Sequence, residues 1–137
     1  MKMQIIKEIQ DILREHGVVA AYVFGSQIEG HSDPMSDLDL GVLFGEQGKS
    51  IMEILSLQAD LQGVCNQIPL DLIVLDKARN SVAFNAITRG KLIYSTDENL
   101  RLRFEENVLR IYHDFAPFME KFYRDLETSL LAGDLND

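Results

Sequence analysis

Two aspartates at the start of an apolar run have the types and spacing to bind a metal. Asp37 and Asp39 begin the run Asp37–Phe44, which reads as a strand. Side chains at positions i and i+2 of a strand point to the same face, so these carboxylates converge while Leu38 and Leu40 point into the core. Two anions at that distance repel each other unless a cation lies between them, and Mg²⁺ prefers such oxygen ligands. The pair therefore predicts a divalent metal site.

A third carboxylate interrupts another apolar run. Asp71 is the only charged residue of Leu70–Leu75, which also reads as a strand. Burial of an unpaired carboxylate is costly, and a metal ion shared with Asp37 and Asp39 would offset that cost. We therefore expect a buried Asp71 to lie beside the strand of Asp37 and Asp39. Three carboxylates can hold two metal ions about 4 Å apart, one activating the attacking oxygen and one binding nucleotide phosphates.

A glycine–serine pair precedes these carboxylates. Gly25 and Ser26 directly follow the predicted buried strand Val18–Phe24, and ten residues separate the pair from Asp37. Glycine lets the backbone approach a ligand closely, and the serine hydroxyl and nearby amides can donate to phosphate oxygens. Taken singly, the pair reads as a turn and each aspartate as a solvated strand edge or cap. Their order on predicted strands favours phosphate and metal chemistry.

The charge balance supports a metal as the phosphate counterion. The chain holds 13 Lys and Arg against 22 Asp and Glu, a net charge of −9, and between Gly17 and Asp76 the only Lys or Arg is Lys49. Nucleic-acid-binding proteins are more often basic, so we do not expect direct nucleic-acid binding. Arg79, Arg89 and Lys91 follow the metal strands, and phosphate contacts and surface roles fit them equally well.

Hydrophobic periodicity predicts an α+β domain of the α/β type. Apolar residues at helical spacing predict a first helix that stops at Gly17, and further patterns predict strands over 18–24, 37–44, 70–75 and 91–94 and helices over 49–66 and 78–89. Strands that alternate with helices indicate one sheet covered by helices. We divide this single domain into a core, residues 1–96, and a helical tail, residues 97–137. Pro117 predicts a kink or a break in the tail.

Neither a membrane segment nor a disulfide is expected. The longest apolar runs fall short of the roughly 18 residues that span a bilayer, and the charged N-terminus does not read as a signal peptide. We therefore expect a cytoplasmic protein without membrane contact. The single Cys65 reads as a buried thiol.

Two segments resemble the signature of a known enzyme superfamily. Val23–Ser26 and Ser36–Leu40 resemble the Gly-Ser-x10-Asp-x-Asp motif of the DNA polymerase β-type nucleotidyltransferases, and the chain length is similar to that of the minimal nucleotidyltransferases, or MNT proteins. The resemblance covers about the first two-thirds of the chain. It implies a mixed sheet flanked by helices, with a polymerase β-like core and a C-terminal helical tail. It also implies Mg²⁺, ATP as substrate, and transfer of a nucleoside monophosphate to a hydroxyl with release of pyrophosphate.

The resemblance also implies roles for the five motif residues and a partner for the protein. Asp37 and Asp39 would ligate both metal ions, Asp71 would help to ligate the catalytic ion and to deprotonate the acceptor, and Gly25 and Ser26 would hold the triphosphate. MNT proteins are commonly paired with HEPN-domain toxins. Their MNT member acts as an antitoxin, in studied cases by adding AMP to a toxin tyrosine.

Two other functions and two oligomeric arrangements stay open. An antitoxin could neutralise its partner by binding alone, although a pure binder has no need of a costly carboxylate cluster. A small-molecule nucleotidyltransferase, like the aminoglycoside-modifying relatives, usually carries an added substrate domain, and the tail here is short. The tail's wide apolar stripe, which includes Phe115, Phe118 and Phe122, predicts either a homodimer or a partner contact.

Overall fold

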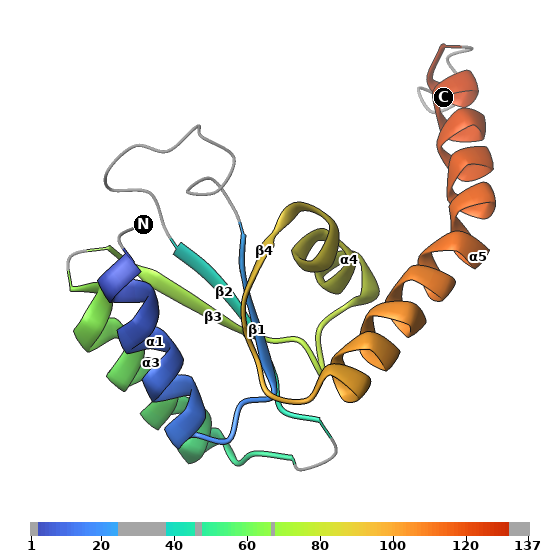
Figure 1. Cartoon of the computed structure of the whole chain (residues 1–137). Helices are drawn as coiled ribbons and strands as arrows, with labels where there is room; N and C mark the ends of the chain where they lie inside the picture. The colour runs from blue at the N-terminus through green and yellow to red at the C-terminus, as the bar shows by residue number, and fades with distance from the viewer. Residues whose placement is uncertain (1–2, 25–37, 46–47, 67, 132–137) are drawn as a thin grey trace.

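The computed structural model describes residues 3–24, 38–45, 48–66 and 68–131, and Figure 1 shows their arrangement. This part of the chain holds four strands and four helices. In chain order they are α1 (Met3–Glu15), β1 (Ala20–Phe24), β2 (Leu38–Leu43), α3 (Ile51–Cys65), β3 (Leu70–Val74), α4 (Asn80–Arg89), β4 (Lys91–Ser95) and α5 (Glu98–Leu131). The predicted elements are thus confirmed, with ends that shift by a few residues. None of the described helices is long and apolar enough to cross a membrane.

The strands form one mixed sheet in the order β3-β2-β1-β4. β1 pairs antiparallel with both β2 and β4, whereas β2 and β3 are parallel. Helices α1 and α3 lie on one face of the sheet and α4 on the other, with α5 beyond α4 (Figure 1). The predicted α+β class and the mixed sheet flanked by helices are confirmed.

The face under α1 and α3, here called the closed face, is an apolar core. Ile9 and Leu13 are four residues apart on α1, and Leu57 and Leu61 are four apart on α3, so each pair lies on one side of its helix. All four side chains have no exposed surface, and they pack with strand residues such as Leu40. Cys65 is buried and free, as expected. Burial raises the pKa of its thiol.

The face toward α4 and α5, here called the open face, is covered unevenly. α4 packs on β1 and β4. It ends at Gly90, where the backbone lies close to Ala86 and to Phe24 of β1. A side chain at Gly90 would collide with the carbonyl oxygen of Ala86 and press on Phe24. On the β3 side of this face, Asp71 is exposed and Ile73 only half-buried. The β3 edge of the sheet is therefore open to water on this face.

Helix α5 is continuous from Glu98 to Leu131, so of the predicted kink or break at Pro117 the break does not occur. Its axis does bend part-way along (Figure 1). A proline removes one backbone donor and crowds the preceding turn, which a long helix can absorb by bending. The first half of α5 packs against α4 and the sheet, and the second half leaves the body of the protein (Figure 1).

Candidate active site

Asp39 and Asp71 are direct neighbours across two parallel strands. The register of β2 and β3 pairs Asp39 with Asp71, and that of β1 and β2 pairs Asp39 with Phe24. Paired residues on adjacent strands point to the same face, and strand axes lie about 4.8 Å apart. Leu38 and Leu40, on either side of Asp39, belong to the closed-face core as predicted. The two carboxylates therefore stand side by side on the open face.

The expected burial of Asp71 is wrong, although its expected place beside Asp39 is confirmed. Asp71 is exposed, because β3 is an edge strand and Asp71 is its second residue. Because its carboxylate keeps contact with water, Asp71 carries no desolvation cost that a bound cation would have to offset. The neighbouring carboxylate of Asp39, which is half-buried, remains the reason to place a cation at this point.

The other predicted site residues, Gly25, Ser26 and Asp37, lie outside the described residues. Phe24 and Leu38 are the described residues on either side of these positions, and Phe24 pairs with Asp39. Phe24 and Leu38 therefore lie at the end of the sheet that carries the carboxylates. Within the described part of the chain no three His, Cys, Asp or Glu side chains form a metal cluster, and the predicted triad includes Asp37.

The carboxylate pair fits a hydrated divalent cation. Two oxygen-bearing side chains on one face, one of them open to water, supply the hard ligands that Mg²⁺ prefers and leave room for bound water or phosphate. The pair alone provides two protein ligands, which is the number that Mg²⁺ commonly takes when substrate phosphates complete its shell.

A comparison with protein families matches residues 7–99 to the family described as Polymerase beta, Nucleotidyltransferase. The chain belongs to this family. The matched range begins in α1 and ends at the first residues of α5, so it contains the whole sheet and both carboxylates. The resemblance seen in the sequence is thus confirmed.

A relative and several solved structures are similar to this chain. A Methanocaldococcus jannaschii protein, provisionally named a protein adenylyltransferase, is 39% identical over 61 residues. The aligned part spans 44% of this chain and 64% of the relative.

Two solved structures share the fold over most of both chains. A toxin-antitoxin crystal structure with AMP-PNP contains a chain with a TM-score of 0.73 and 22% identity, covering 89% of this chain and 98% of that one. A complex described as tri-AMPylated Shewanella oneidensis HEPN toxin with MNT antitoxin gives a TM-score of 0.71 and 20% identity, covering 93% and 99%. At these identities the likeness shows the fold.

Basic side chains lie at both ends of the nucleotidyltransferase sheet. Lys91 pairs with Val23, so it starts β4 at the same end as Asp39, and exposed Arg89 ends α4 just before it. Lys49 is at the opposite end, where its Nζ lies 3.9 Å from Glu53 Oε2 and 5.9 Å from the Phe44 ring centre. Position thus favours Lys91 and Arg89 over Lys49 for phosphate contact.

A cluster that the sequence did not predict joins α5 to the open face. The Tyr22 hydroxyl donates to Glu105 Oε1 at 2.7 Å, and Arg101 donates to both oxygens of Glu105 at 3.2 and 3.1 Å. Burial, followed by the hydrogen bond to Glu105, raises the pKa of Tyr22. The Arg101–Glu105 spacing of four is a recognisable helix pair, but Tyr22 lies 83 positions from Glu105 and gives no such signal.

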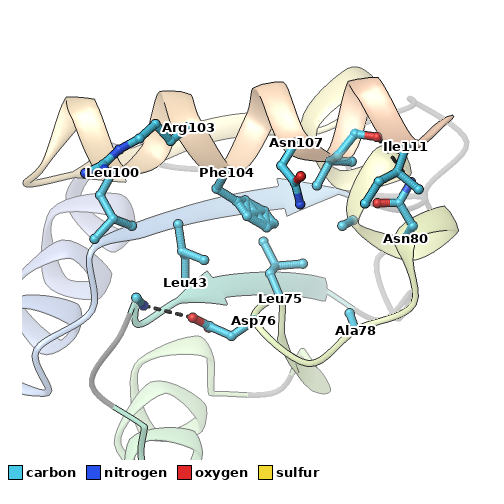
Figure 2. A pocket seen from close by; sticks show the side chains of 13 residues that line it. Leu43, Leu75, Asp76, Ala78, Asn80, Leu100, Arg103, Phe104, Asn107 and Ile111 are labelled. Carbon is cyan, nitrogen blue, oxygen red and sulfur yellow. Dashed lines mark hydrogen bonds between the residues drawn. The ribbon is translucent and has the colours of Figure 1, made fainter. Parts of the chain in front are cut away.

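A cavity at the far end of the open face is separate from the carboxylates. Figure 2 shows Leu43 and Leu75 on one side of it and Phe104 of α5 on the other, and its volume is about 590 Å³. Asp76 borders it and accepts hydrogen bonds from the amides of Phe44 and Gly45, at 2.9 and 2.8 Å. Four residues of strand, roughly 13 Å, separate Leu43 from Asp39.

Proposed function

We propose that this nucleotidyltransferase transfers AMP from ATP to a hydroxyl on a partner protein, a tyrosine of a HEPN-domain toxin, and so acts as an antitoxin. The observation that carries the proposal is the Asp39–Asp71 pair on the open face, within the polymerase β nucleotidyltransferase family. A carboxylate pair of this kind has a chemical use in binding metal and nucleotide.

The similar proteins support the nucleotide and the acceptor. One similar structure contains AMP-PNP, an ATP analogue, and another contains a HEPN toxin that is described as tri-AMPylated. The Methanocaldococcus relative carries the provisional name of a protein adenylyltransferase. All three descriptions agree with AMP transfer to protein.

We assign the chemistry to the five motif residues. Asp37, Asp39 and Asp71 would hold Mg²⁺, two ions when nucleotide is bound, and Gly25 and Ser26 would hold the triphosphate. Bound Mg²⁺ would neutralise phosphate charge and make the acceptor hydroxyl more acidic. The acceptor oxygen attacks the α-phosphorus, the bond to the β-phosphate oxygen breaks, and pyrophosphate leaves. Asp71 assists removal of the acceptor proton.

The exposure of Asp71 favours a macromolecular acceptor. Asp71 lies near the start of an edge strand and is open to water. A tyrosine that projects from another protein can reach such an edge directly. Small-molecule sites are usually concave and bury most of the ligand, and the cavity of Figure 2 lies at the other end of the strands.

The test is the mass of a co-expressed partner. The chain is expressed with a HEPN-domain protein, and the partner's intact mass is measured with the wild type and with Asp37→Asn/Asp39→Asn. We expect additions of AMP with the wild type alone. A partner that the wild type inhibits without any change in mass would contradict the catalytic proposal and support neutralisation by binding.

A further inference from the structure

The apolar stripe that joins α5 to the protein continues along the half of α5 that leaves it. Val108 is 4% exposed, and Tyr112 stacks on Phe84 of α4 with ring centres 3.7 Å apart. Beyond Tyr112 the same side of the helix stays apolar at steps of one, three or four residues, through Phe115, Met119, Phe122, Tyr123, Leu126 and Leu130. We call these six residues the distal stripe.

The distal stripe is exposed over its whole length. Phe115 is 60% exposed, Phe122 52% and Tyr123 61%, and the second half of α5 rises away from the rest of the molecule (Figure 1). Contiguous apolar surface of this kind marks an interaction site. Aromatic residues and methionine are also enriched where proteins meet.

Acidic residues flank the distal stripe on both sides. At 3.6 residues per turn, Glu120 and Glu127 border one side and Asp125 the other, while Lys121 and Arg124 lie further round, toward the opposite face of the helix. All three acidic residues are exposed. Among the described residues none of the three makes an ion pair or a side-chain hydrogen bond.

The apolar stripe could be covered by a second copy of this chain or by a helix of another protein, and the charge pattern distinguishes between the two. If a second copy packed its own distal stripe against this one, acidic borders would face acidic borders, and like charges across a helical seam are destabilising. The net charge of −9 on each copy adds to that repulsion. A helix whose apolar face is bordered by Lys and Arg would place opposite charges along both borders.

A cavity at the base of the distal stripe offers an anchor point. It has a volume of about 640 Å³ and lies between α4 and α5. Its lining includes Ser81 of α4 and Tyr112, Phe115, Met119 and Tyr123 of α5. Interfaces gain most of their binding energy from a few large side chains buried in such pockets. An apolar side chain on the partner helix would fit here.

We propose that residues 112–131 of α5 dock an amphipathic helix of the acceptor protein, whose apolar face is bordered by Lys and Arg and fills the cavity at Ser81. The identity of this partner as the acceptor rests on the proposed function. The docking surface itself rests on the distal stripe and its acidic borders.

The test uses the whole chain and two synthetic helices of equal length. Both peptides carry the same leucine face, which is bordered by Lys in one and by Glu in the other. We expect the Lys-bordered peptide to bind about tenfold more tightly at low salt, and we expect the difference to shrink as salt rises. In the variant Glu120→Lys/Glu127→Lys the preference falls or reverses. Fluorescence anisotropy measures each affinity.

Matched variants separate docking from folding and from catalysis. Phe122→Glu places a charge in the distal stripe and should weaken binding of the Lys-bordered peptide about tenfold or more. Thr128→Glu adds the same charge on the opposite face of α5 and should bind like the wild type, with both variants equally helical by circular dichroism. Asp39→Asn should bind the peptide normally, so a failure of catalysis and a failure of docking are distinguishable.

Three results would overturn the docking proposal. Equal affinity for the two peptides would remove the role of the acidic borders. Equal binding by the Phe122 and Thr128 variants would remove the role of the distal stripe. Light scattering that shows a dimer, lost in Phe122→Glu and kept in Thr128→Glu, would identify a second copy as the occupant.

Discussion

The two faces of the sheet differ in what they contain. On the closed face, α1 and α3 bury an unbroken apolar layer in which Ile9, Leu40 and Leu61 have no exposed surface. On the open face, the same strands present Asp39 and Asp71 at one end. The alternation of side chains along β2 makes this division, because Leu38 and Leu40 face one way and Asp39 the other.

The difference separates stability from chemistry. Burial on the closed face stabilises the fold whether or not the open face binds anything, so the carboxylates can be exposed without loss of the core. Changes at the carboxylates of the open face should then alter transfer and leave stability nearly constant, while changes on the closed face should do the reverse. Two substitutions test this separation, and a third tests how α5 is held on the open face.

The largest effect is expected from Asp71→Asn. Loss of one metal-binding carboxylate removes several kcal/mol of transition-state stabilisation, so AMP transfer should fall about a thousandfold. Because Asp71 is exposed, the midpoint of thermal unfolding should stay within a few degrees of the wild type. Radiolabel transfer and calorimetry on the same sample measure both. Near wild-type transfer would remove Asp71 from the site.

Leu61→Ala should give the opposite pattern. Leu61 is fully buried under the closed face, and its truncation leaves a cavity that lowers the free energy of unfolding by about 3 kcal/mol. Transfer per folded molecule should be unchanged at a temperature where the variant stays folded. Urea unfolding and a transfer assay normalised to folded protein provide the check. A specific loss of transfer would show that the two faces are coupled.

Tyr22→Phe should give the smallest effect, with a defined pH dependence. It removes the 2.7 Å hydrogen bond to Glu105 and should cost about 1–2 kcal/mol near neutral pH. Because the pKa of Tyr22 is raised in the folded protein, the unfolded chain loses this proton first as pH rises above about 10. The wild-type advantage over the variant should therefore be constant below about pH 10 and decline above it.

Urea unfolding of both proteins over this pH range measures the difference. An advantage that grows above about pH 10 would show that Tyr22 does not hold its proton more tightly in the fold.

The order of strands and helices was predictable from the sequence because each element has a clear apolar period and a clear end. α1 stops where Gly17 takes a φ of 72°, and α4 stops at Gly90. The place of Asp71 beside Asp39 followed from the motif and the strand pattern. The exposure of Asp71 could not be predicted, because an apolar run in the sequence does not distinguish an edge strand from a central strand.

Hydrogen-bond partners that lie far apart in the chain could not be predicted from the sequence. The Tyr22–Glu105 hydrogen bond joins a strand to a helix far along the chain, and the amides held by Asp76 lie more than thirty positions before it. The sequence also left open whether α5 bends or breaks at Pro117, because local propensity disfavours proline inside a helix but a long helix can absorb the cost by bending. The apolar stripe of the tail was visible in the sequence, but which half of it is covered was not.

The most direct test of the central claim is label transfer from [α-³²P]ATP to the co-expressed partner protein with Mg²⁺, comparing Asp39→Asn with Asp60→Asn. Asp60 provides a matched control, because the same change falls on an exposed residue of α3 that pairs with His16. We expect label on the partner with the wild type and Asp60→Asn, none with Asp39→Asn, and equal unfolding midpoints for the two variants. Equal labelling by Asp39→Asn would contradict the role of this carboxylate in transfer.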